Sequence, residues 1–200
     1  MLANPFPMLA SHLVSSEAEL LIRARDGDVD AYAEFVRTFE RRVRALLGRL
    51  LDDERDVEEA AQDTFVQAWR NLSRFRGDSQ PFTWLYRIAV NEALQRTRRK
   101  KLDLRPLDDL SPGDSSFFDH RTNVDALAEN RELSSFLASK LRELPFEYRA
   151  PLVLRDIEGW SNQEVASALE LSLPAAKSRI HRARIQLRDM VDARRKESSD

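Results

Sequence analysis

Apolar residues recur at three- and four-residue steps along most of this chain, which is the period of an α-helix. The first block with this pattern runs from Glu17 to Lys101. Its apolar positions include Leu20, Leu21, Ala24, Tyr32, Phe35, Val36, Phe39, Val43, Leu46, Leu47 and Leu50. The pattern predicts a compact helical bundle, with breaks at 26–28, near 51–53 and across 73–81.

The pattern stops after Lys101, where Pro106, Pro112, Gly113 and several serines and acids replace the helical repeat. We expect this segment to be a flexible linker. The helical pattern returns at Val124 and continues to the C-terminal region. The predicted organisation is a flexible tail over 1–16, a helical domain over 17–101, a linker over 102–123, a second helical domain over 124–193 and a tail over 194–200.

Composition supports an all-α fold of two small helical domains, because the 200 residues include only 5 glycines and are rich in Leu, Ala, Arg and Glu. There is no cysteine, which excludes disulfides and thiol redox sensing within the chain. No apolar run approaches the roughly 20 residues of a membrane span, and the first residues lack the basic region of a secretory signal. We therefore expect a cytoplasmic protein without membrane insertion.

The stretch from Trp160 to Arg188 is typical of a helix-turn-helix. Ser161 and Glu164 have the spacing of a capping box, which starts a helix. The turn at 170–172 ends that helix, and Ser172 can cap a second one. In the second helix an apolar stripe is expected to face inward: Leu173, Ala176, Ile180, Ala183 and Leu187.

The opposite side of this second helix carries hydrogen-bonding and cationic groups suited to base edges and phosphates in a DNA major groove. These are Lys177, Ser178, Arg179, His181, Arg182 and Arg184. The alternative is a solvated basic face, which amphipathic helices commonly have. Helix-turn-helix units also occur in many kinds of regulator, so this motif alone does not name a function.

A second candidate surface lies upstream, in the helix expected after Pro81. Trp84, Arg87, Asn91, Gln95 and Arg98 fall on one helical face. A flat ring, a bidentate amide and cations are what unstacked bases require, so single-stranded DNA is a plausible ligand. The alternative is that Trp84 is a core aromatic, which is the more common fate of such residues.

Two motifs resemble extracytoplasmic-function sigma factors of bacterial RNA polymerase. The first is F-R-G-D-S-x-x-x-T-W-L-Y-R-I-A-V-N, from Phe75 to Asn91. The second combines E-Y-R-A-P-L-V-L-R-D-I-E-G-W-S-N-Q-E-V-A, from Glu147 to Ala166, with K-S-R-I-H-R-A-R, from Lys177 to Arg184. The resemblance covers both helical blocks and implies a transcription initiation factor with no catalytic residues, metal or cofactor of its own.

The resemblance also implies residue roles. Contacts to the minus-ten element fall on Ser73, Phe75, Arg76, Gly77, Asp78, Trp84, Arg87, Asn91, Arg96, Arg98, Arg99 and Lys100. Contacts to the minus-thirty-five element fall on the six recognition residues above together with Asn162 and Gln163. The surface for core polymerase corresponds to Gln62, Asp63, Val66, Gln67 and Arg70. The implied partners are the β′ coiled coil and β flap of that enzyme, promoter DNA and an anti-sigma factor.

One departure from the family pattern lies in the helix-turn-helix turn. Relatives commonly have Gly-Leu-Pro-x-Gly-Thr-Val, whereas this chain has Glu170-Leu171-Ser172-Leu173-Pro174-Ala175-Ala176. Ala175 therefore lacks the threonine hydroxyl that would donate to phosphate. Ser172, Asn162 and Gln163 could supply contacts from nearby.

Two other functions remain open from the residues alone. The N-terminal bundle could sense a ligand or dimerise in an ordinary helix-turn-helix regulator, which would leave Trp84 and Asn91 buried. The acidic residues between Asp52 and Glu59 could also serve a metal-dependent enzyme. Against that reading, acids at a helix start favour the helix dipole and usually stay solvated.

Overall fold

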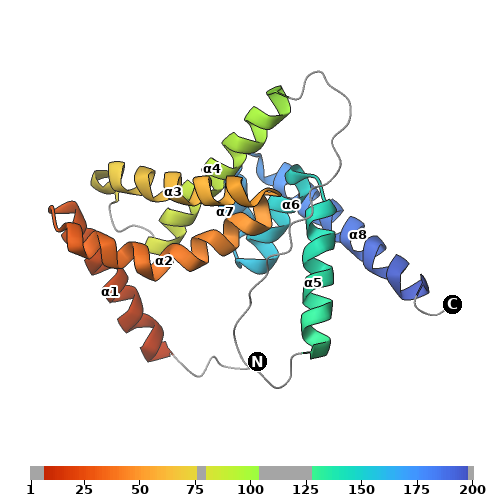
Figure 1. Cartoon of the computed structure of the whole chain (residues 1–200), viewed down its shortest axis with the longest axis horizontal. Coiled ribbons are helices and arrows are strands. Elements are labelled where there is room, and N and C mark those ends of the chain that lie inside the picture. Colours follow the sequence, from red (N-terminus) through yellow and green to blue (C-terminus); the bar gives the residue numbers. More distant parts are fainter. Residues whose placement is uncertain (1–6, 76–79, 104–127, 198–200) are drawn as a thin grey trace. The chain divides into compact units, whose positions relative to one another are not determined.

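The computed structural model describes residues 7–75, 80–103 and 128–197, and within these ranges the chain is helical apart from short turns (Figure 1). The all-α prediction is confirmed. The linker expected at 102–123 lies almost entirely outside the described residues. Contacts divide the described chain into two units: parts of Met1–Leu47 and Val57–Glu92 form the first, and parts of Gly48–Asp56 and Ala93–Asp200 form the second.

The chain begins with a long helix where a tail was expected. Helix α1 spans Pro7–Arg25, so residues 7–16 are helical. Proline is favoured at a first helical position, because its φ is already helical and its missing N–H has no partner there. The following residues, up to Arg25, contain neither glycine nor a further proline, so nothing interrupts the helix.

Helix α1 ends in a Schellman turn at Gly27. The Gly27 N–H donates to the Ala24 carbonyl and the Asp28 N–H to the Arg23 carbonyl, while Gly27 adopts a φ of +101°. Asp28 then caps helix α2 (Val29–Leu50), because its Oδ1 accepts the Ala31 N–H at 2.9 Å. The predicted break at 26–28 is confirmed.

The first unit buries aromatic and aliphatic side chains from α2, from α3 (Glu54–Arg70) and from α4 (Pro81–Asp103). Phe35 and Phe39 are fully buried, with ring centroids 4.7 Å apart. The buried positions on α3 are small: Ala60, Ala61, Thr64 and Ala68. A short 3-10 turn, η1 (Leu72–Arg74), follows α3.

The second unit contains the C-terminal helices α5 (Ala128–Glu143), α6 (Phe146–Leu152), α7 (Asn162–Ala168) and α8 (Leu173–Glu197). Helix α6 continues into a π-helical turn, η2 (Val153–Ile157). Pro151, inside α6, cannot donate a backbone hydrogen bond, and the widened turn directly follows it. Helix α8 packs against α5, α6 and α7, and it runs to Glu197, beyond the expected end at 193.

None of the described helices is both long and apolar enough to cross a bilayer.

Candidate nucleic-acid and polymerase interfaces

The candidate single-strand surface follows one side of α4. Asn91, Gln95 and Arg98 are exposed, whereas Trp84 and Arg87 are half-buried. On another side of α4, Tyr86, Ala89 and Ala93 are buried, while Phe82 is half-buried. The polar face is therefore distinct from the buried side of α4, and Trp84 and Arg87, near the helix start, are its more enclosed part.

Trp84 is held by an aromatic neighbour from the preceding loop. The Phe75 ring lies 5.4 Å from the Trp84 ring, centroid to centroid, at an interplanar angle of 59°. Phe75 is 4% exposed, so in this structure its ring supports Trp84 and is not open to solvent. Ser73 is exposed, and Arg76, Gly77 and Asp78 lie outside the described residues.

The cations at the C-terminal end of α4 are already engaged with acids. Lys100 forms an ion pair with Asp56, and hydrogen bonding to that carboxylate raises the pKa of Lys100. Arg98 Nη2 donates to Glu170 Oε2 at 3.1 Å. Arg96 is half-buried, whereas Arg99 is exposed. At least two of the four cations from Arg96 to Lys100 therefore already contact carboxylates of the chain.

The helix-turn-helix prediction is confirmed in its local geometry. The Glu164 N–H donates to Ser161 Oγ at 3.2 Å, and the Ser161 N–H donates to Glu164 Oε2 at 2.9 Å, which completes the capping box. The Ala175 N–H donates to Ser172 Oγ at 3.3 Å, so Ser172 caps α8 as expected. These bonds satisfy backbone donors that a helix start leaves unpaired.

The turn between α7 and α8 is a second Schellman motif, and it contains no glycine. The Leu171 N–H donates to the Ala166 carbonyl at 2.8 Å, and the Glu170 N–H to the Ser167 carbonyl at 3.4 Å. Glu170 has a φ of +55°. It occupies the position that Gly27 has in the first turn, where an L side chain is unfavourable.

The predicted base-reading face of α8 is largely open. Lys177, Ser178, His181, Arg182 and Arg184 are exposed, and Arg179 is half-buried. On α7, Gln163 is exposed and Asn162 half-buried. The inward stripe is confirmed at Ala176, Ile180 and Ala183.

Leu187 in that stripe is half-buried, whereas Leu173 is 37% exposed. It lies at the first position of α8, where neighbouring helices cover the side chain less than along the helix centre. The expectation that Leu173 faces inward was wrong.

Arg184 is fixed by an acid from η2. Its Nε donates to Asp156 Oδ2 at 2.9 Å and its Nη2 to Asp156 Oδ1 at 2.6 Å. This bidentate contact lowers the pKa of Asp156 and raises that of Arg184. Arg184 therefore has an intramolecular partner as well as the exposure that a DNA contact needs.

The predicted polymerase surface on α3 combines polar and apolar exposed groups. Gln62, Asp63 and Arg70 are exposed, and Gln67 is half-buried. Val66 is 46% exposed. Trp69 is 40% exposed, and its ring lies 4.8 Å from the half-buried Tyr32 ring, centroid to centroid. The small residues on the buried face of α3 leave Trp69 at the edge of the core.

The acidic cluster near the start of α3 binds cations of the chain itself. Asp52 pairs with Arg149, Asp56 with Lys100 and Glu58 with Arg44. Among the described residues no group of three or more His, Asp or Glu side chains is arranged to hold a metal ion. Three acids of this cluster are therefore engaged in ion pairs with cations of the chain.

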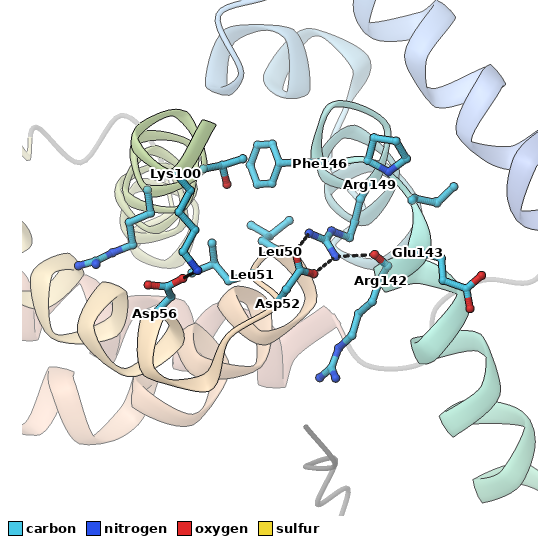
Figure 2. Close-up of a pocket in the computed structure, with 13 residues that line it drawn as sticks. Leu50, Leu51, Asp52, Asp56, Lys100, Arg142, Glu143, Phe146 and Arg149 are labelled. Carbon is cyan, nitrogen blue, oxygen red and sulfur yellow. Dashed lines mark hydrogen bonds and ion pairs between the residues drawn. The ribbon is translucent and has the colours of Figure 1, made fainter. Parts of the chain in front are cut away.

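A cavity of about 370 Å³ opens within the second unit, lined in part by Leu50, Asp52, Asp56, Lys100 and Phe146 (Figure 2). Arg149 extends toward Asp52, where Nη1–Oδ1 is 2.5 Å and Nη2–Oδ2 is 3.2 Å. Arg149 Nη1 also donates to the Arg142 carbonyl at 3.1 Å. Arg149 is 2% exposed, so its positive charge is buried, and the Asp52 carboxylate compensates it.

Sequence reasoning missed the roles of Arg149, Asp156 and Glu170. The available signals were weak: an arginine beside a continuous apolar run, and an acid where relatives have glycine. The hydrophobic pattern of a helix indicates which of its own faces is buried. It does not indicate which distant residue pairs with a charged side chain, so these ion pairs could not be predicted from the sequence.

Comparison with known proteins identifies both halves of the chain. The Sigma-70 region 2 family matches residues 35–102, and the Sigma-70 region 4 family matches residues 137–187. The RNA polymerase sigma-H factor of Pseudomonas aeruginosa is 32% identical over 178 residues, which cover 84% of this chain and 90% of that protein. The ECF RNA polymerase sigma factor SigW of Bacillus subtilis is 32% identical over 184 residues, covering 86% and 98%.

Solved structures agree with this assignment. CnrH, in complex with the cytosolic domain of CnrY, matches with a TM-score of 0.60 at 29% identity, over 89% of this chain and 98% of that one. The sigma factor RpoE from Bartonella quintana, in complex with the anti-sigma factor NepR, matches in fold with a TM-score of 0.64 at 20% identity, over 80% and 96%. The chain belongs to the extracytoplasmic-function family of RNA polymerase sigma factors, the non-catalytic initiation factors that direct the polymerase to promoters.

Proposed function

We propose that the polar face of α4 binds the single-stranded minus-ten element during promoter opening. The observation that carries this proposal is the exposure of Asn91, Gln95 and Arg98 along one side of α4, with Trp84 at its start. Trp84 offers a flat surface for a base, and Asn91 offers an amide that can bond to a base edge. Arg98 and its neighbour Arg99 neutralise the phosphate backbone.

The enclosed end of this face is suited to holding separated strands. Flipping a base out of the duplex costs a few kcal/mol of unstacking, so a stacking surface must compensate. Phe75 supports Trp84 from behind and fixes its ring orientation. The preceding loop, with Ser73 among its described residues, completes the site in this proposal. The exposure of Asn91 also speaks against a buried, ligand-sensing bundle.

A second surface, on α8, reads the minus-thirty-five element in the major groove. Its exposed residues Lys177, Ser178, His181 and Arg182 present hydrogen-bonding groups along α8, as a helix that lies in the major groove does. Arg179→Ala should weaken binding to a minus-thirty-five duplex and leave binding to single-stranded minus-ten DNA unchanged. Unchanged duplex binding would contradict the placement of Arg179 in this interface.

Core polymerase docks on α3 in this proposal. Val66 and Trp69 are exposed apolar groups bordered by Gln62, Asp63 and Arg70, a mixture that suits contact with another helix. The β′ coiled coil is the partner proposed for this face, and the β flap for the C-terminal domain. Because the polymerase works in the cytoplasm, the chain is placed there.

An anti-sigma factor is the proposed regulator, supported by the complex of the RpoE relative with NepR. Such an inhibitor would act by covering the polymerase-binding surfaces. Constant activity under stress, together with the lack of any co-purifying inhibitor, would argue against this control.

The decisive experiment is reconstituted transcription. Promoters are first mapped by sequencing the transcripts that increase when the chain is overproduced. Purified chain and core polymerase should then initiate at those promoters, and core polymerase alone should not. Failure of the pair to initiate at any mapped promoter would overturn the proposal.

A further inference from the structure

Glu170 combines an unfavourable backbone conformation with an exposed charge. Among the residues that the structure describes, it is the one non-glycine residue with a positive φ. The equivalent position of the first Schellman turn is Gly27, which tolerates this conformation without a steric cost. Residues in such unfavourable conformations cluster at functional sites, so the Glu170 side chain is a candidate for a function.

The Glu170 carboxylate contacts one of the cations assigned to minus-ten DNA. Its Oε2 accepts a hydrogen bond from Arg98 Nη2 at 3.1 Å, and both residues belong to the second unit. Arg98 lies on the same face of α4 as Asn91 and Gln95. The turn of the helix-turn-helix therefore places a negative charge on a side chain that would otherwise be available to a phosphate.

Two further ion pairs, each with a largely buried arginine, join segments of the second unit. Arg49 Nη1 lies 3.1 Å from Glu158 Oε1, with side chains 18% and 14% exposed. Arg149 is bidentate to Asp52 (Figure 2). These pairs join the segment around residue 50 to the C-terminal helices. The Arg98–Glu170 pair belongs to the same unit and is more open to solvent, with side chains 55% and 66% exposed.

We propose that Glu170 is an intramolecular competitor of promoter DNA for Arg98. This inference rests on the proposed function of the α4 face. While Glu170 occupies Arg98, a phosphate must displace the carboxylate before it can be bound. Exposed ion pairs are weak and are screened by salt, so the competition lowers affinity without preventing binding. Such a contact would reduce unproductive binding to DNA by the chain in this conformation.

The test measures binding of the full chain to a fluorescent, mixed-sequence single-stranded DNA. A mixed sequence serves because phosphate contacts do not depend on the base. Glu170→Gln removes the charge and keeps the shape and backbone preference of the residue, so the turn itself is little changed. Glu147→Gln is the matched control, because it removes one exposed acid from the first turn of α6.

Glu170→Gln should bind the DNA about two- to fivefold more tightly at low salt, the range expected from an exposed ion pair. The gain should shrink as salt is raised. It should also disappear in the Arg98→Ala background, and Glu147→Gln should bind like the unmodified chain. A gain that persists in the Arg98→Ala background, or no gain in the unmodified background, would overturn the competition.

The same measurements separate this inference from the proposed function. Arg98→Ala alone should weaken binding and reduce its salt dependence, because one phosphate contact is lost. If Arg98→Ala binds as the unmodified chain does, the assignment of Arg98 to DNA fails. If it weakens binding while Glu170→Gln has no effect, the assignment stands and the competition fails.

Discussion

Arg184 on α8 and Asp156 in the π-helical turn form a bidentate ion pair, with N–O distances of 2.9 and 2.6 Å. The pair joins α8 to η2 within the C-terminal domain. Two guanidinium nitrogens of Arg184 are therefore engaged by a carboxylate of the chain itself.

Asp156→Asn should lower the free energy of unfolding at neutral pH by about 0.2–1 kcal/mol, the range for a partly exposed pair. The pKa of Asp156 is lowered in the folded chain, so its stabilisation is complete above the ordinary aspartate pKa of about 3.9 and is lost as the pH falls through the lower folded value. Urea unfolding at several pH values should therefore show the difference from the unmodified chain narrowing below about pH 4. A difference that stays constant with pH would contradict the ion pair.

Ser161→Ala should destabilise the C-terminal domain by about 1 kcal/mol, because the capping box loses its side-chain acceptor for the Glu164 N–H. Ser167→Ala is the matched control, since it makes the same chemical change at an exposed position inside α7. The control should be neutral or slightly stabilising, because alanine is the better helix former. Thermal unfolding followed by circular dichroism measures both, and equal effects of the two changes would exclude a capping role.

Asn91→Ala should weaken initiation, because it removes the amide that we propose bonds to a base edge. The expected cost is about 1–3 kcal/mol at the promoter position it reads. Core polymerase binding, measured by size-exclusion chromatography or fluorescence anisotropy, should be unchanged. If core binding is lost as well, Asn91 has a structural role and the proposed base contact is wrong.

Val66→Glu should weaken binding to core polymerase by tenfold or more, because it places a charge in the apolar centre of the proposed α3 contact (roughly 1.4 kcal/mol per factor of ten). Val66 is 46% exposed, so the fold should tolerate the change. The free variant should bind single-stranded DNA as the unmodified chain does. This measurement is the control that the variant is folded. Unchanged polymerase affinity would move the docking surface away from this part of α3.

Much of the fold was predictable from local patterns. The all-α class, the break at Gly27, the capping box of Ser161 and Glu164 and the buried face of α4 follow from hydrophobic period and capping chemistry. These features depend on residues within a few positions of one another, so the spacing of residues in the sequence predicts them. The helical residues 7–16 were missed, because a segment with two prolines near a chain end resembles a tail.

Local patterns along the chain therefore specify most of the helices and most of their buried faces. They also specify the family, because its motifs lie in short stretches, from Phe75 to Asn91, from Glu147 to Ala166 and from Lys177 to Arg184. Which charges are shared depends on how the chain folds. Arg98 meets Glu170, Arg149 meets Asp52, and Arg184 meets Asp156 across separations of 72, 97 and 28 residues. Electrostatic attraction acts through space, so only the folded chain can show which cations remain for DNA and which ones the protein has already engaged.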